Sequence, residues 1–164
     1  MSNQLNVKER KRTLYRELSK TDADIARGKR ISGITLTSIF ILRAVLTLYE
    51  TIFFSTNGKD MSVWTYVLAA VGAVMLLMIY DGNRAFAYII TLAAAVHILY
   101  HFSSVHEAVE AFSGADIYTS VSIIVFILQF ILSLFITVSP KAKKYLDCMQ
   151  TINLKIRGEM LGKK

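Results

Sequence analysis

Four polar residues lie inside apolar stretches, where they could bind an ion or take part in proton transfer. They are Arg43, Glu50, His97 and Gln129. A charged side chain near the centre of a bilayer costs about 3 to more than 10 kcal/mol, depending on the reference state. Such a residue therefore faces a partner or a wet cavity, or reaches the membrane surface. We interpret the four as candidates for a binding or transport site, and a structural role in tying helices together is the alternative.

Arg43 and Glu50 belong to the apolar stretch 31–54 and are two helical turns apart, with Thr47 between them on the same side. A helix needs about 20 residues to cross the hydrocarbon core, so this stretch is long enough. If it enters from the cytosol, Arg43 lies somewhat past mid-membrane and Glu50 lies near the outer surface. In the structural interpretation, Arg43 contacts a neighbouring helix and Glu50 reaches water among the headgroups.

Three further apolar stretches have the length of a membrane-crossing helix: 61–80, 85–104 and 117–139. The composition agrees, because 54% of the residues are hydrophobic and the mean hydropathy is +0.44. The short connection at 81–84 makes its two helices antiparallel. We therefore predict an all-α integral membrane protein with four transmembrane helices in an antiparallel bundle.

The basic residues gather at the two ends of the chain. Residues 1–30 hold nine of the 19 Lys and Arg residues, and residues 141–164 hold seven. We predict a basic cytosolic leader at 1–30, a membrane domain at 31–139 and a basic amphipathic cytosolic tail at 140–164. Lys and Arg favour the cytosolic side, so both termini are expected in the cytosol and the protein in the cytoplasmic membrane. Anionic headgroups are the expected partner, because neither end contains a nucleic-acid-binding motif.

The basic tail carries an apolar stripe formed by Tyr145, Met149, Ile152 and Ile156. Their spacing is helical, with charged residues between them, so the tail is predicted to be an amphipathic helix. Three positions fit such a helix: on the membrane surface, against the leader, or against a partner protein.

Two polar segments predict local contacts near the membrane surface. Thr21 and Asp24 resemble a capping box that starts the helix leading into the membrane. Asp81 and Arg84 flank a tight turn and are placed to form an ion pair across it.

Arg43, His97 and Gln129 lie within roughly 5 Å of one level, counted from the cytosolic ends of their helices. Glu50 and His101 lie together near the outer surface. We predict that the first, third and fourth helices turn these residues toward each other. Gln129 and His97 would then provide hydrogen-bond partners for the guanidinium.

The second apolar stretch, 61–80, contains no formal charge. Ala69 and Ala73, with Gly72 beside them, give it a small-residue face of the kind that lets helices approach closely. We therefore expect this helix to act as a packing element.

His97 and His101 are four residues apart and share one helix face. Together with Glu50 and Glu107 they include the ligand types that zinc uses. The His-Glu-x-x-His pattern of metalloproteases is absent, because residue 98 is Ile98. A metal-dependent membrane enzyme that uses the two histidines is thus the third functional hypothesis.

The sequence contains no phosphate-binding loop, dinucleotide glycine pattern or hydrolase elbow, so no catalytic residue and no cofactor is predicted. The single cysteine, Cys148, cannot form a disulfide within the chain. The first functional hypothesis is a non-enzymatic accessory, assembly or regulatory subunit with a membrane-protein partner. The second is a transporter or channel subunit that uses the polar cluster. Four helices enclose little volume, so this second hypothesis implies a homo-oligomer.

Overall fold

The computed structural model describes residues 2–58, 62–101 and 117–161. These residues form helices and contain no strand. The helices are α1 (Ser2–Thr21), α2 (Ala23–Thr56), α3 (Val63–Tyr80), α4 (Arg84–His101), α6 (Ile117–Val138) and α7 (Pro140–Leu161). Three of the described helices, α2, α3 and α6, are long and apolar enough to cross a membrane, and α4 contributes a shorter apolar segment, Arg84–Tyr100. The all-α prediction is therefore confirmed for this part of the chain.

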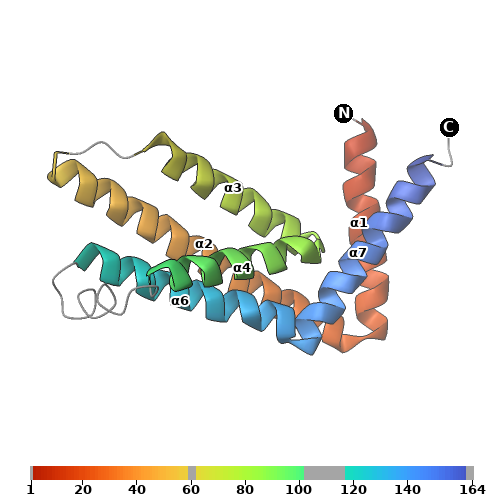
Figure 1. Ribbon diagram of the computed structural model, residues 1–164. Helices are drawn as coiled ribbons and strands as arrows, with labels where there is room; N and C mark the ends of the chain where they lie inside the picture. The colour runs from red at the N-terminus through yellow and green to blue at the C-terminus, as the bar shows by residue number, and fades with distance from the viewer. Residues whose placement is uncertain (1, 59–61, 102–116, 162–164) are drawn as a thin grey trace.

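The helices form an elongated bundle with two further helices across one end (Figure 1). α2, α3, α4 and α6 run along the bundle, whereas α1 and α7 lie beside each other at the end where both termini are found. We call α1 and α7 together the cap. The closest association between the cap and the bundle is that of α7 with α2.

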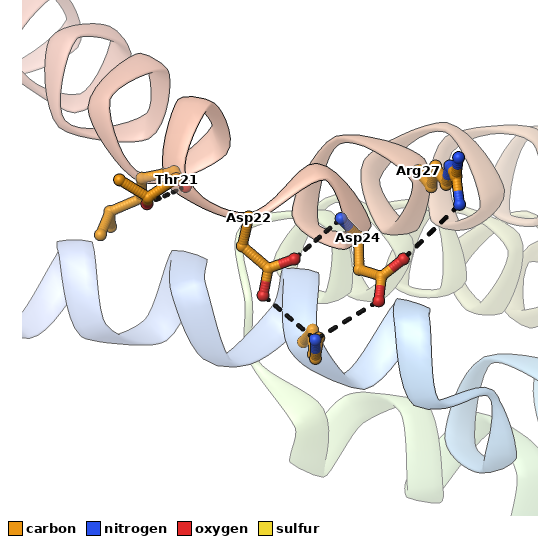
Figure 2. A network of polar contacts seen from close by, with 6 residues as sticks. Thr21, Asp22, Asp24 and Arg27 are labelled. Carbon is orange, nitrogen blue, oxygen red and sulfur yellow. Dashed lines mark hydrogen bonds and ion pairs between the residues drawn. The ribbon is translucent and has the colours of Figure 1, made fainter.

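α2 is one continuous helix that starts beside the cap, well before the predicted membrane stretch at 31–54. Its N-cap is Asp22, whose carboxylate accepts a hydrogen bond from the Asp24 backbone N–H at 2.9 Å (Figure 2). The predicted capping box is replaced by this contact, because the Thr21 hydroxyl donates to the Leu18 carbonyl at 2.8 Å. The same helix therefore connects the cap to the apolar bundle.

A tight turn joins α3 to α4 and contacts the cap. Gly82 in this turn has a φ of 99°, in the left-handed region that favours glycine. The two ends of the turn do not pair with each other as predicted. Asp81 accepts from the Lys11 ammonium at 2.9 Å, and Arg84 pairs with Asp147 at 2.5 Å. Each pairs with a residue of the cap instead, so the turn is attached to both cap helices.

Buried apolar residues form two clusters. The larger one continues from the bundle into the cap and includes Leu36, Ile39, Leu76, Ile79, Ile136, Tyr145, Met149, Ile152 and Ile156. The smaller one lies farther along the bundle and contains Leu46, Ala94, Val125 and Phe126. All four residues of the predicted stripe on the tail belong to the larger cluster. Three positions were considered for the tail helix. In the structure it packs against other helices of the same chain, α2 and α1.

Candidate functional site

Arg43 of α2 is partly buried and contacts an aromatic ring of α6. Its guanidinium carbon lies over the Phe126 ring, 4.5 Å from the ring centroid. The ring's negative face attracts the cation, and such a contact is strongest where water is excluded. No hydrogen bond or ion pair joins this guanidinium to another residue that the structure describes. Its capacity to donate hydrogen bonds therefore remains available.

His97 of α4 contacts the same ring. The imidazole stacks on Phe126 with the ring centroids 3.5 Å apart and an angle of 25° between the planes. Phe126 thus joins Arg43 and His97, which belong to different helices. The sequence predicted that these two residues meet, and the structure brings them together through an apolar side chain instead of a direct hydrogen bond.

Gln129 lies one helical turn after Phe126 on α6. Its side chain is 4% exposed, and within the described part of the chain its side-chain oxygen has no hydrogen-bond partner. A buried amide oxygen without a partner costs about 1–3 kcal/mol relative to one that is bonded. The Gln129 side chain is therefore the second polar group, after Arg43, that can still form a hydrogen bond at this depth of the bundle.

Arg43 and Gln129 line the same cavity, which has a volume of about 660 Å³. Its walls are α2, α3 and α4, and Gln129 comes from α6. The rim includes exposed apolar side chains of α2 and α3, among them Phe40, Leu48 and Leu68. The cavity is therefore open at the surface of the bundle, and within its lining the guanidinium of Arg43 is the permanent positive charge.

The predicted packing face of α3 lines this cavity. Ala69, Gly72 and Ala73 all belong to its wall, and a Cβ atom built at Gly72 meets nothing within 4 Å. Beyond them, the Tyr66 hydroxyl and the Thr51 hydroxyl are 3.3 Å apart and link α3 to α2. The small residues thus leave room along α3 where a neighbouring helix was expected to pack.

The remaining predicted residues lie outside the cavity lining. Glu50 of α2 is partly buried and close enough to attract the Arg43 guanidinium electrostatically. α4 ends at His101, whose side chain lies outside the described residues, as does Glu107. Among the side chains that the structure describes, no group of three or more His, Cys, Asp and Glu residues is arranged to hold a metal ion.

Phe126 is the central contact that the sequence did not single out. An aromatic residue among apolar neighbours does not stand out in the sequence as polar residues inside apolar stretches do. A signal was present, because Phe126 and Gln129 are three residues apart and so share one face of the helix.

The cap contains the second group of polar contacts. The Lys144 ammonium lies 3.1 Å from the Asp22 carboxylate and 3.4 Å from that of Asp24. Figure 2 shows both carboxylates pointing toward α7, while Asp24 also faces Arg27 at 3.9 Å. At the far end of the cap, Arg10 of α1 pairs with Glu159 of α7 at 2.7 Å.

These contacts shift the protonation of the groups that make them. The hydrogen bond from Lys144, followed by that from the Asp24 amide, lowers the pKa of the Asp22 carboxyl below its ordinary value. The same pairing, first with Asp22 and then with Asp24, raises the pKa of Lys144. Both groups are well exposed, so solvent screening keeps the stabilisation small.

Close backbone contacts hold α7 against the bundle. A Cβ atom built at Gly28 of α2 would lie 2.0 Å from the Lys141 carbonyl oxygen, so only glycine fits there without a shift. Gly82 is similarly close, with its Cβ position 2.7 Å from the Gln150 nitrogen. Between these points the buried Tyr145 hydroxyl donates to the Tyr80 carbonyl at 2.9 Å, and burial raises the pKa of this phenol.

The two regions have different chemical capacities. The cavity offers one cation, one amide and an apolar wall, which suit the binding of an amphipathic molecule. The cap offers a folded surface with exposed basic residues, which suits contact with anionic headgroups or a protein.

Comparison with protein-family models, curated proteins and solved structures finds no match to this chain.

Proposed function

We propose that the chain is a four-span membrane protein that acts as a non-enzymatic accessory, assembly or regulatory subunit. α4 is the fourth span in this proposal. Its 18 residues extend about 27 Å at 1.5 Å per residue, close to the 30 Å of a hydrocarbon core. It also runs beside α6 and α3 within the bundle.

The charge distribution supports an orientation with both termini in the cytosol, in the cytoplasmic membrane. Both termini lie at the cap end of the bundle, and the cap holds most of the basic residues. Lys and Arg favour the cytosolic side, where anionic headgroups also attract them. Exposed Arg30 at the start of the apolar part of α2 lies where those headgroups would be.

The observation that carries the proposed role is the attachment of the cap to the α3–α4 turn. Lys11 of α1 binds the Asp81 carboxylate, and the Asn153 amide of α7 donates to the Asp81 carbonyl at 2.6 Å. A protein that binds the cap would therefore bear directly on α3, which forms a wall of the cavity. This connection is what a regulatory or assembly subunit needs between its cytosolic surface and its membrane helices.

The test combines topology reporters with native-state purification. Reporter fusions at both termini are expected to report the cytosol. A membrane-protein partner is expected to comigrate with the chain in native electrophoresis after gentle solubilisation. Charge reversal of exposed Arg12 and Arg16 on α1 should release it. Charge reversal of exposed Lys155 on α7 is the matched control on the other cap helix. Termini on opposite faces, or a chain that always migrates alone, would contradict the proposal.

A transporter or channel subunit is the second candidate, and the cavity with Arg43 and Gln129 favours it. One bundle encloses only about 660 Å³ in this cavity, so a path across the membrane would need several copies. Anion flux into vesicles that contain the purified protein, reduced by Arg43→Gln, would support this candidate. A purified protein that is monomeric and gives no flux would exclude it.

A further inference from the structure

The cavity between α2, α3 and α4 combines three features that together indicate a ligand. It contains a guanidinium without an ion-pair partner among the described residues, a buried amide oxygen that is also unpartnered there, and an apolar wall. Glu50 attracts this guanidinium electrostatically, but within the described part of the chain no hydrogen bond or ion pair joins the two side chains. A cation inside a bilayer without a hydrogen-bonded counterion is costly, and so is an unbonded buried amide. A ligand with an anionic head and an apolar body would neutralise the cation, and its head would accept from the Gln129 NH₂ group once that amide has rotated.

The size of the cavity favours a small molecule over a helix from another protein. About 660 Å³ falls within the range of about 300–1,000 Å³ that is typical of small-molecule sites. A membrane-crossing helix about 10 Å wide and 30 Å long occupies about 2,000 Å³ or more. The open rim with Phe40, Leu48 and Leu68 also lets an apolar chain enter from the side.

The charge of the site favours a carboxyl head. One guanidinium neutralises one negative charge, whereas a phosphate monoester carries about −1.5 to −2 and would leave an excess beside an apolar wall. One carboxyl oxygen can accept from Arg43. The second carboxyl oxygen can accept from the Gln129 NH₂ group once that amide has rotated.

We propose that this cavity binds a single-chain amphipathic carboxylic acid of the fatty-acid type. The carboxyl group lies between Arg43 and Gln129, and the alkyl chain lies along the small-residue face of α3, past Gly72 and Ala73. The site goes beyond the subunit role proposed above and rests on the membrane placement proposed there. Terminus reporters test that placement separately, so its failure can be distinguished from failure of the ligand site.

The experiment uses the full chain in phosphatidylcholine nanodiscs with a photoactivatable analogue of palmitic acid. Labelled peptides are expected to come from the cavity walls on α2 and α3. Unlabelled palmitic acid should compete, and hexadecanol, which has the same chain without a charge, should compete at least about tenfold less well. Lysophosphatidic acid, with its phosphate monoester head, should also compete less well.

Two variants address the head and the chain of the ligand separately. Arg43→Gln removes the cation and is expected to weaken binding about tenfold or more. Gly72→Phe fills the wall at a position with open space around it, so it should abolish labelling without unfolding the protein. Arg30→Gln and Leu77→Phe are the matched controls, at exposed positions outside the cavity lining.

Three results would overturn the proposal. The first is labelling that survives both Arg43→Gln and Gly72→Phe. The second is competition by hexadecanol as strong as that by palmitic acid, because the head would then contribute nothing. The third is stronger competition by lysophosphatidic acid, which would mean that the site selects a phosphate. If Arg43→Gln fails to fold, Gly72→Phe and Gln129→Leu still test the site.

Discussion

The cap and the cavity satisfy their polar groups to different degrees. In the cap, Lys144 lies between two carboxylates and Arg84 pairs with Asp147. In the cavity, Arg43 has an aromatic ring as its contact and the Gln129 oxygen lacks a partner among the described residues. The polar groups of the cap are thus paired within the chain, whereas those of the cavity keep donors and acceptors that a ligand could use. A bound ligand would therefore form new hydrogen bonds in the cavity.

The largest expected effect tests the close packing of the cap. Gly28→Ala should destabilise the protein by about 3 kcal/mol or more, because its Cβ would overlap the Lys141 carbonyl and separate α7 from α2. Gly72→Ala is the matched control in the cavity, where the new methyl group meets open space, and it should change stability by less than about 1 kcal/mol. Thermal unfolding in detergent measures both. Equal effects would mean that cap and cavity are packed alike.

The next effect tests the unmet capacity of the cavity. Without added amphipath, Gln129→Leu should raise the free energy of unfolding by about 1–3 kcal/mol, because it removes a buried oxygen that has no partner. Gln150→Leu, at an exposed position on α7, should give no such gain. Denaturant unfolding of both variants in the same detergent is the measurement. A loss of stability on Gln129→Leu would show that this amide is satisfied in the folded protein.

A smaller effect tests one hydrogen bond between the cap and the bundle. Tyr145→Phe keeps the buried ring and loses the hydroxyl that donates to the Tyr80 carbonyl, so it should cost about 1 kcal/mol. Tyr88→Phe on the exposed side of α4 should be close to neutral. The two midpoints of thermal unfolding give the comparison. A neutral Tyr145→Phe would show that packing alone holds this contact.

The smallest effect tests the exposed charges of the cap. The pKa of Asp22 is lowered in the folded state, so its stabilisation is fully present above the unfolded value of about 3.9. It is lost as the pH falls through the lower folded value. Lys144→Gln should therefore flatten the fall in melting temperature over this acidic range. Lys155→Gln, at an exposed position on the same helix, should leave the profile unchanged.

Much of the fold could be predicted because its signals are local. Apolar stretches long enough to cross a membrane predicted helices, and the stripe from Tyr145 to Ile156 predicted which face of the tail helix is buried. The capping pattern at Thr21 and Asp24 predicted a helix that starts there and leads into the apolar stretch, and α2 does start at Ala23, with Asp22 in place of Thr21 as its N-cap. The sequence did not determine which surface the tail helix packs against, since an amphipathic pattern does not specify what covers its apolar face.

The sequence could predict the depth of the candidate site's polar residues, but it could not predict which side chains they contact. Counting residues placed Arg43 and Gln129 at one level, and both line one cavity. The sequence could not show that Phe126 would take the place of a polar partner. It also could not show that the small residues of α3 would border open space. The Phe126 contacts depend on how α6 packs against α2 and α4, and the open space depends on how far α3 stands from α2. The ion-pair partners of Asp81 and Arg84 were not predicted because they come from distant parts of the chain.

The Tyr145 contact also bears on how the molecule is made. α7 follows all four bundle helices in the chain, yet its side chains complete the larger buried cluster. During synthesis, therefore, the bundle helices leave the ribosome before α7, the helix that contacts α1, α2 and the α3–α4 turn together. Until α7 covers them, the apolar sides of α1 and of the first part of α2 are accessible to chaperones and proteases. A chain cut short before residue 140 would remain in that vulnerable condition.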